Sequence, residues 1–245
     1  MSPRIAIVAA MERELAPLTH DWELSTVNAE GRALICYESE HAVAVFGGMG
    51  CKHAEAAGRA AVEKYGSQVL ISAGLAGALI RSLKAGQVIL PNVIVDAATG
   101  TEYRCSLGGE VIGGGVLVSN FEVAGKETKP ELVECFHALA VDMEAAGVAR
   151  VATERDLGFR CVKAISDEFD FNMPPLGRFV NQEGNLEIGK LARWVSMRPQ
   201  HWPTMVALGR NSRWATRALC DWLRANLTAN FRAAKVVAVG EYSKG

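Results

Sequence analysis

The chain alternates short apolar runs with segments in which apolar and polar residues have a helical spacing. Runs rich in Val, Ile and Ala predict strands at 4–10, 33–38, 41–47, 68–73, 87–95, 115–119, 138–142 and 159–165. The segments between them predict helices, the clearest at 12–18, 51–65, 129–136 and 143–155. Apolar strands that alternate with helices are typical of a largely buried sheet covered by helices. The pattern therefore predicts an α/β sandwich.

The residue composition of the chain changes after Asp167. Pro174-Pro175 and a polar loop at 181–185 lead into helical material that carries four of the five tryptophans, namely Trp194, Trp202, Trp214 and Trp222. Because no Ser/Gly-rich linker separates this region from the rest, we expect one domain over residues 1–245. Its Trp-rich helical part, at about 174–230, should cover the strand ends. Residues 233–245 fit either a short strand or a loose tail.

Composition and charge exclude several classes of protein. The chain has 49% hydrophobic and 22% charged residues, which is ordinary for a globular protein, and 26 basic against 27 acidic residues leave no field that would attract nucleic acid. Six cysteines form no CxxC pair, and five histidines have no metal-ligand spacing. No apolar run is long enough for a signal peptide or a membrane span. We expect a cytoplasmic protein without a metal or cofactor.

Acidic residues follow three of the apolar segments directly. Glu14, Glu144 and Asp167 come after the runs that end near 10, 142 and 165. In open α/β sheets, ligands bind beyond the carboxyl ends of the strands, so these residues are candidates for one site. Taken singly, each is better explained as an acidic group at a helix N-terminus. Their joint occurrence carries the prediction.

Five segments of the sequence also resemble a known protein family. IAIVAAMERELAPL, FGGMGCKHAEAA, LISAGLAGAL, VDMEAAGVARVA and VKAISDEFD, in this order between about residues 4 and 170, resemble the purine nucleoside phosphorylase superfamily. They are most similar to its methylthioadenosine/S-adenosylhomocysteine nucleosidase branch. The resemblance implies a single-domain, three-layer α/β/α sandwich around a mixed β-sheet. It also implies an enzyme that cleaves the N-glycosidic bond of a 5′-modified adenosine-type nucleoside and releases adenine, and a homo-oligomer, preferably a dimer.

The resemblance assigns roles that fit the chemistry of this bond. Cleavage passes through an oxocarbenium-like sugar while negative charge grows on the departing purine. Asp167, oriented by Ser166, resembles the acid that donates a proton or hydrogen bond to the base. Glu144 resembles the residue that holds the ribose hydroxyls, with Met143 packed against the sugar. Glu14 resembles the carboxylate that positions and deprotonates the attacking water.

Further substrate contacts are implied by position. Two glycine-containing turns, Gly47–Gly50 and Ala73–Gly77, should let backbone approach the ligand. The remaining expected contacts are Met11, Gly48, Met49, Gly74, Leu75, Phe121, Val123 and Lys163.

This sequence departs from the family pattern at three places. Leu75 stands where the nucleosidases carry Ser, and Lys163 replaces an Arg. Both changes affect the expected nucleophile. We still expect hydrolysis, because a carboxylate at Glu14 would repel inorganic phosphate, and keep phosphorolysis and nucleoside binding without catalysis as alternatives. The longer segment after Asp167 resembles a hopanoid-associated branch that acts on adenosylhopane. A lipid substrate of that kind would bring the protein to a membrane surface, whereas an ordinary helical layer or a dimer contact also explains the segment.

Overall fold

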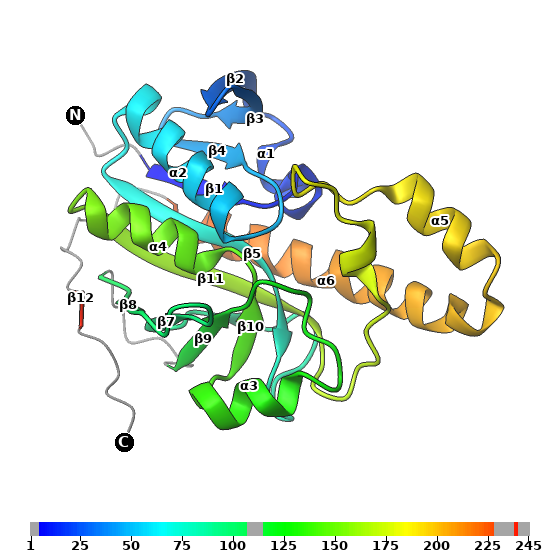
Figure 1. The fold of residues 1–245 in the computed structure, drawn as a ribbon. Helices are drawn as coiled ribbons and strands as arrows, with labels where there is room; N and C mark the ends of the chain where they lie inside the picture. The colour runs from blue at the N-terminus through cyan, green and yellow to red at the C-terminus, as the bar shows by residue number, and fades with distance from the viewer. Residues whose placement is uncertain (1–4, 107–114, 228–237, 240–245) are drawn as a thin grey trace.

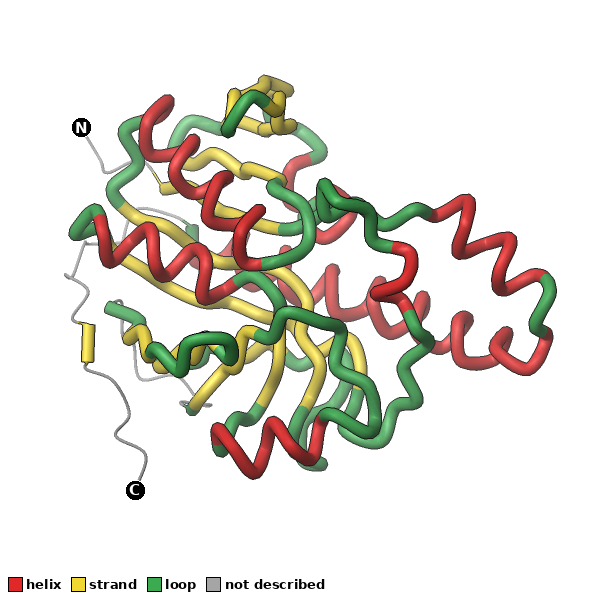
Figure 2. Tube along the Cα trace, viewed as in Figure 1, coloured by secondary structure: helices red, strands yellow, loops and turns green. Residues whose placement is uncertain are grey.

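The centre of the molecule is a mixed β-sheet with helices on both faces (Figure 1, Figure 2). The computed structural model describes residues 5–106, 115–227 and 238–239. Within them the sheet has twelve strands. In chain order the strands are β1 (Ile5–Ala9), β2 (Glu23–Ala29), β3 (Arg32–Glu38), β4 (Ala42–Phe46), β5 (Val69–Ala78), β6 (Val88–Ile89), β7 (Val93–Asp96), β8 (Glu102–Arg104), β9 (Val116–Ser119), β10 (Ala140–Asp142), β11 (Gly158–Asp167) and β12 (Ala238–Val239).

Parallel and antiparallel pairs both occur in this sheet. The order is β12-β8-β7-β9-β10-β5-β1-β4-β3-β2, and β11 pairs with both β5 and β6. The strands β4, β1, β5 and β11 run parallel, so their carboxyl ends meet at one edge. β10 instead pairs antiparallel with the last residues of β5, with Val141 opposite Gly77. Its carboxyl end therefore points back toward the middle of β5.

Helices cover the sheet from both sides. The helical segments are η1 (Glu12–Glu14), α1 (Ala16–Thr19), α2 (Cys51–Tyr65), α3 (Lys129–Phe136), α4 (Ala145–Glu154), η2 (Leu176–Phe179), α5 (Ile188–Ser196), η3 (Pro199–His201) and α6 (Trp202–Asn226). α2 and α4 pack together on one face, and α6 with α1 packs on the other. Alternation along β1 follows these layers, because Ala6 and Val8 face the first layer while Ile5 and Ile7 face the second. The expected three-layer sandwich around a mixed sheet is confirmed.

Several predicted boundaries were wrong. Residues 73–77, expected to form a turn, continue β5, which pairs with β11 from Val69 to Gly77. The predicted strand 87–95 is split into β6 and β7 around Pro91, which has no amide hydrogen for a ladder. The predicted helix 12–18 is a 3-10 turn followed by a four-residue helix. β2 and β8 were not predicted.

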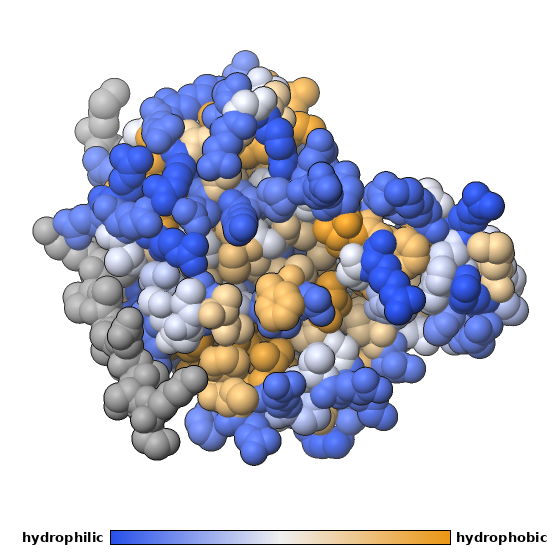
Figure 3. Space-filling model, in the orientation of Figure 1, coloured by the Kyte–Doolittle hydropathy of each residue, from blue (hydrophilic) through white to orange (hydrophobic). Residues whose placement is uncertain are grey.

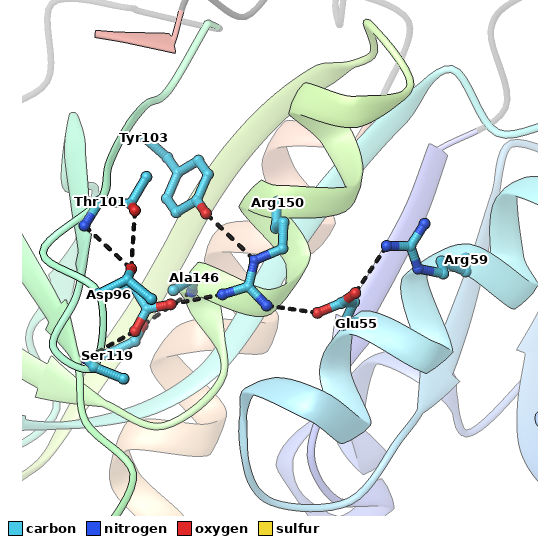
Figure 4. Close-up of polar contacts among 10 residues, drawn as sticks. Glu55, Arg59, Asp96, Thr101, Tyr103, Ser119, Ala146 and Arg150 are labelled. Atoms are coloured by element: carbon cyan, nitrogen blue, oxygen red, sulfur yellow. Dashed lines mark hydrogen bonds and ion pairs between the residues drawn. The ribbon is translucent and has the colours of Figure 1, made fainter. Parts of the chain in front are cut away.

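An ion-pair network ties α2 and α4 to the strands beside them (Figure 4). The Arg150 guanidinium on α4 donates to Asp96 Oδ2 on β7 (2.6 Å) and to Glu55 Oε2 on α2 (2.7 Å). Glu55 also accepts a bond from Arg59 (2.8 Å). Ser119, at the end of β9, accepts a hydrogen bond from the Ala146 amide at the start of α4 (2.9 Å). These contacts fix the helix that begins directly after Glu144.

The C-terminal helices α5 and α6 form a hairpin that projects from the body (Figure 1). Trp194 stacks on His201 (centroids 4.8 Å apart) and packs against Phe179, which holds the two helices together. The other end of α6 lies against the sheet, where Trp214 covers Gly86. None of the helices in the described ranges has both the length and the apolar character needed to cross a membrane.

Candidate active site

Residues at or shortly after the ends of three strands line one cavity of about 640 Å³. Glu14 follows β1, Glu144 follows β10, and Asp167 is the last residue of β11. All three side chains are buried, and all three residues line the cavity. The antiparallel direction of β10 explains the meeting, because it returns Glu144 toward the edge at which the parallel strands end. The expected convergence of the three carboxylates is therefore found.

Glu14 is held by the short 3-10 turn after β1. The Met11 amide donates to Glu14 Oε2 (3.2 Å), and the thiol of Cys220 on α6 donates to the Glu14 carbonyl. Burial raises the pKa of Glu14 from its ordinary value, while the nearby Lys163 charge and the Met11 amide oppose that shift. A buried carboxyl group with a raised pKa is a stronger base than a solvated one.

Glu144 faces the cavity from the start of α4. Its two carboxyl oxygens accept hydrogen bonds from the Gly50 amide (3.0 Å) and the Met143 amide (3.3 Å). Burial, followed by the neighbouring charges of Asp142 and Glu14, raises the pKa of Glu144 to about 7, although Lys163 acts in the opposite direction. The carboxylate is thus costly to ionise in this buried position and would be stabilised by a positive charge placed beside it.

Lys163 and Asp142 form a buried ion pair beneath these two glutamates. Lys163 Nζ lies 2.8 Å from Asp142 Oδ2, and both side chains are almost completely buried. Asp142 also accepts from Ser119 Oγ (2.6 Å) and from the Ala145 amide (2.8 Å). Burial by itself would lower the pKa of Lys163, but the Asp142 charge outweighs it and the net shift is upward. Lys163 is therefore a permanent cation among the carboxylates.

Asp167 has a donor on each carboxyl oxygen. Ser166 Oγ donates to Oδ1 (2.8 Å), and the ammonium group of Lys129 donates to Oδ2 (2.7 Å). Gly77 on β5 leaves room for this carboxylate, because a Cβ atom there would lie 2.9 Å from Asp167 Oδ2. The adjacent strand, the serine and the lysine together fix the orientation of Asp167.

The wall of the cavity opposite β5 is apolar and comes from the C-terminal region. It contains Met173, Leu176, Leu186, Leu191, Met205 and Leu208. Figure 3 shows apolar surface where the projecting helices meet the body. Arg13, Arg213 and Arg217 also contribute to the lining. The cavity thus has an acidic floor, an apolar wall and several cationic groups.

Comparison with known proteins agrees with this arrangement. The family model described as "Phosphorylase superfamily" matches residues 4–122, just under half of the chain. No curated protein matches the chain in sequence. Over residues 4–122 the chain is similar to the phosphorylase superfamily. The match supports the expectation of an enzyme.

Solved structures of several enzymes share the fold over more than nine tenths of the chain. A 5′-methylthioadenosine/S-adenosylhomocysteine nucleosidase from Helicobacter pylori is 17% identical, with 91% of this chain and 97% of that chain covered and a TM-score of 0.67. Arabidopsis thaliana 5′-methylthioadenosine nucleosidase is 16% identical, with coverage of 94% and 97% and a TM-score of 0.70. Futalosine hydrolase from H. pylori is 18% identical, with coverage of 92% and 99% and a TM-score of 0.65.

Most of the expected site residues line this cavity. The lining includes residues expected to act on or bind the substrate, namely Met11, Glu14, Met49, Leu75, Val123, Met143, Glu144, Ser166 and Asp167. Lys163 lies beneath the cavity in its ion pair with Asp142. Its side chain therefore affects the site through charge and not as part of the wall.

Three of the expected contacts do not line the cavity. A Cβ at Gly48 would stand 2.5 Å from the Glu183 carbonyl oxygen, so this glycine admits the 181–185 loop. Gly74 is part of β5, where a Cβ would be 3.5 Å from Glu14 Oε2 and 3.6 Å from Lys163 Nζ. Phe121 is outside the lining and 74% exposed.

Sequence reasoning missed Lys129 and Asp142. Asp142 precedes Met143 in the string that carried the resemblance, so its place beside the site had a signal. Lys129 lies in the segment Lys126-Glu127-Thr128-Lys129-Pro130, which reads as an ordinary charged helix start. In the part of the chain that the structure describes, no group of three or more His, Cys, Asp or Glu side chains is placed to hold a metal ion.

Proposed function

We propose that this enzyme hydrolyses the N-glycosidic bond of a 5′-modified adenosine-type nucleoside and releases adenine. The proposal rests on the arrangement of Glu14, Glu144 and Asp167. All three are buried, and all three line one cavity. The similar solved structures are nucleosidases of methylthioadenosine, S-adenosylhomocysteine and futalosine, which supports the same bond as the target.

Asp167 and Glu144 act on the two parts of the nucleoside. Charge develops on the purine as the bond breaks, and Asp167 passes a proton or hydrogen bond to it while Ser166 keeps the carboxyl group in place. Glu144 accepts hydrogen bonds from the ribose hydroxyls. Its negative charge stabilises the oxocarbenium-like sugar more than the neutral ground state, which is the condition for a faster reaction.

Glu14 supplies the base for the attacking water. Its carboxylate lies in the 3-10 turn that follows β1, and burial raises its pKa, which makes it a stronger base than a solvated carboxylate. Three carboxylates, Glu14, Asp142 and Glu144, lie close to Lys163, the buried cation that pairs with Asp142. An excess of negative charge there repels inorganic phosphate and favours water as the nucleophile.

Phosphorolysis is the second candidate, and one observation favours it. Arg13, Arg213 and Arg217 line the same cavity, and guanidinium groups bind phosphate well. The two reactions differ in whether release of adenine depends on added phosphate.

The 5′ substituent is proposed to be bulky and apolar, as in adenosylhopane. The C-terminal wall of Met and Leu side chains supports this choice, because it offers an apolar surface to whatever extends from the sugar. Exposed apolar side chains at the projecting hairpin, including Ile188, Met197, Trp202 and Val206, suit contact with a membrane that holds such a lipid. A homo-oligomer, preferably a dimer, and a cytoplasmic location stay predictions.

One experiment separates these functions. The purified protein is incubated with methylthioadenosine, S-adenosylhomocysteine or a lipid-linked adenosine, with and without phosphate, and free adenine is measured. We expect release without phosphate, fastest for the apolar substituent. Asp167→Asn and Glu14→Gln should each reduce turnover by roughly 100-fold or more while the fold is kept. Wild-type rates in both variants would refute the assigned roles, and saturable binding without product would indicate a non-catalytic protein.

A further inference from the structure

A fully buried lysine, Lys129, contacts Asp167, the residue proposed to act on the departing purine. Lys129 is the first residue of α3, and its side chain is 0% exposed. Its ammonium group donates to Asp167 Oδ2 (2.7 Å) and to the Glu168 carbonyl (2.9 Å). A buried ammonium group is costly unless it is paired, so this position requires the negative charge of Asp167.

The other charged groups on this side are turned outward. The Glu168 side chain pairs with Lys84 (2.9 Å), and Asp170 pairs with Arg81; all four side chains are substantially exposed. Exposed pairs are screened by water and contribute little to the buried carboxylate. On α3 itself, Glu131 and Glu134 are exposed. Lys129 is therefore the buried charged group in direct contact with Asp167, whereas Glu122, Glu144, Arg213 and Arg217 face it across the cavity.

This pairing conflicts with a simple picture of Asp167 as a protonated acid. An ammonium group in contact with a carboxyl group favours the ionised carboxylate. Both Asp167 oxygens already accept a hydrogen bond, one from Ser166 and one from Lys129. The ammonium group of Lys129 is thus a proton donor one hydrogen bond behind the carboxyl group that faces the cavity.

We propose that Lys129 stores the proton that the departing adenine receives and delivers it through Asp167. The inference rests on the proposed function and deepens it. As the bond between C1′ and N9 breaks, its electron pair passes to the purine ring. A ring nitrogen of the purine takes a proton from Asp167, and a proton moves from Lys129 Nζ to Asp167, leaving a neutral amine. The attacking water gives its proton to Glu14, and exchange with solvent returns one to Lys129.

The arrangement sets how activity depends on pH. With Lys129 present, the pair keeps one proton available into the alkaline range, because an amine holds its proton there. Without the ammonium group, the proton must reside on the buried Asp167 carboxyl itself, which can hold it at low pH and releases it as pH rises. Loss of Lys129 should therefore remove activity selectively at high pH.

A protonation measurement tests the inference without relying on catalysis. In protein labelled with ¹³C at aspartate carboxyl carbons, Asp167 is assigned by comparison with Asp167→Asn and titrated by NMR. Asp167 should be ionised at about pH 7 in the wild type and protonated there in Lys129→Met. Lys126→Met, an exposed lysine of the preceding loop, is the matched control and should behave as wild type. A protonated Asp167 at about pH 7 in the wild type overturns the proposal, even if Lys129→Met does not fold.

The catalytic measurement uses adenine release from methylthioadenosine across the pH range. Lys129→Met should lose roughly 100-fold in turnover at about pH 9 and much less at about pH 5, whereas Lys126→Met should follow the wild type. An equal loss at every pH would make Lys129 merely structural and refute the inference. If the wild type released adenine from none of the three nucleosides, the proposed function would fail, and the titration would still decide whether Lys129 keeps Asp167 ionised.

Discussion

Glu144→Gln should stabilise the protein at alkaline pH although it removes a group of the proposed active site. Glu144 is buried, and its pKa is raised from 4.5 to about 7, first by burial and then by the charges of Asp142 and Glu14. The folded protein therefore binds a proton at Glu144 more tightly than the unfolded chain does. Ionising this carboxyl group at higher pH costs stability.

The size of the effect follows from the shift. A carboxyl group with a raised folded pKa contributes stability that is fully present below about pH 4.5 and is lost as pH rises through about 7. Each pKa unit corresponds to about 1.4 kcal/mol, so the full cost above that range is about 3 kcal/mol. Between about pH 5 and about pH 8 the change is about 2 to 3 kcal/mol. Glutamine carries no charge, so Glu144→Gln is not destabilised in this way as pH rises.

Urea unfolding followed by tryptophan fluorescence measures the difference. The stability gain of Glu144→Gln over the wild type should be about 2 to 3 kcal/mol larger at about pH 8 than at about pH 5. Glu134→Gln, on the exposed face of α3, is the matched control and should parallel the wild type at both pH values. If Glu144→Gln also ran parallel to the wild type, the side chain would not carry the raised pKa and the electrostatic account of the site would be wrong.

Two further variants test the packing and the charge of the site. Gly77→Ala would place a Cβ 2.9 Å from Asp167 Oδ2, so adenine release should fall by roughly 100-fold with little change in stability, whereas Gly189→Ala, which meets nothing within 4 Å, should be neutral in the same assay. Lys163→Met would leave its buried carboxylate partner uncompensated and should destabilise the fold by about 3 to 5 kcal/mol in urea unfolding. Lys52→Met, on the exposed face of α2, should change stability by less than about 0.5 kcal/mol, and equal effects of the two lysine variants would contradict a buried ion pair.

Local sequence determined the layered architecture. The apolar run that became β1 buries alternate residues against opposite helical layers, and that burial is readable from the sequence as an uninterrupted apolar segment. β2 escaped prediction because most of its side chains are exposed, so it lacks the apolar run that marks the other strands. Residues 73–77 were misread because glycines suggest a turn, whereas pairing with β11 on one side and β10 on the other keeps them extended.

Part of the candidate site could likewise be predicted from the sequence, and part could not. Glu14, Glu144 and Asp167 were found from the sequence because each directly follows a predicted strand, and strand ends share an edge of the sheet. The apolar wall from the C-terminal helices and the contact of Lys129 with Asp167 depend on where distant segments pack. Residues 38 positions apart have no local pattern that reveals an ion pair. The sequence by itself determined which side chains reach the edge of the sheet, and only the tertiary structure decided which charges surround them, because electrostatic energies depend on distance and burial in the folded chain.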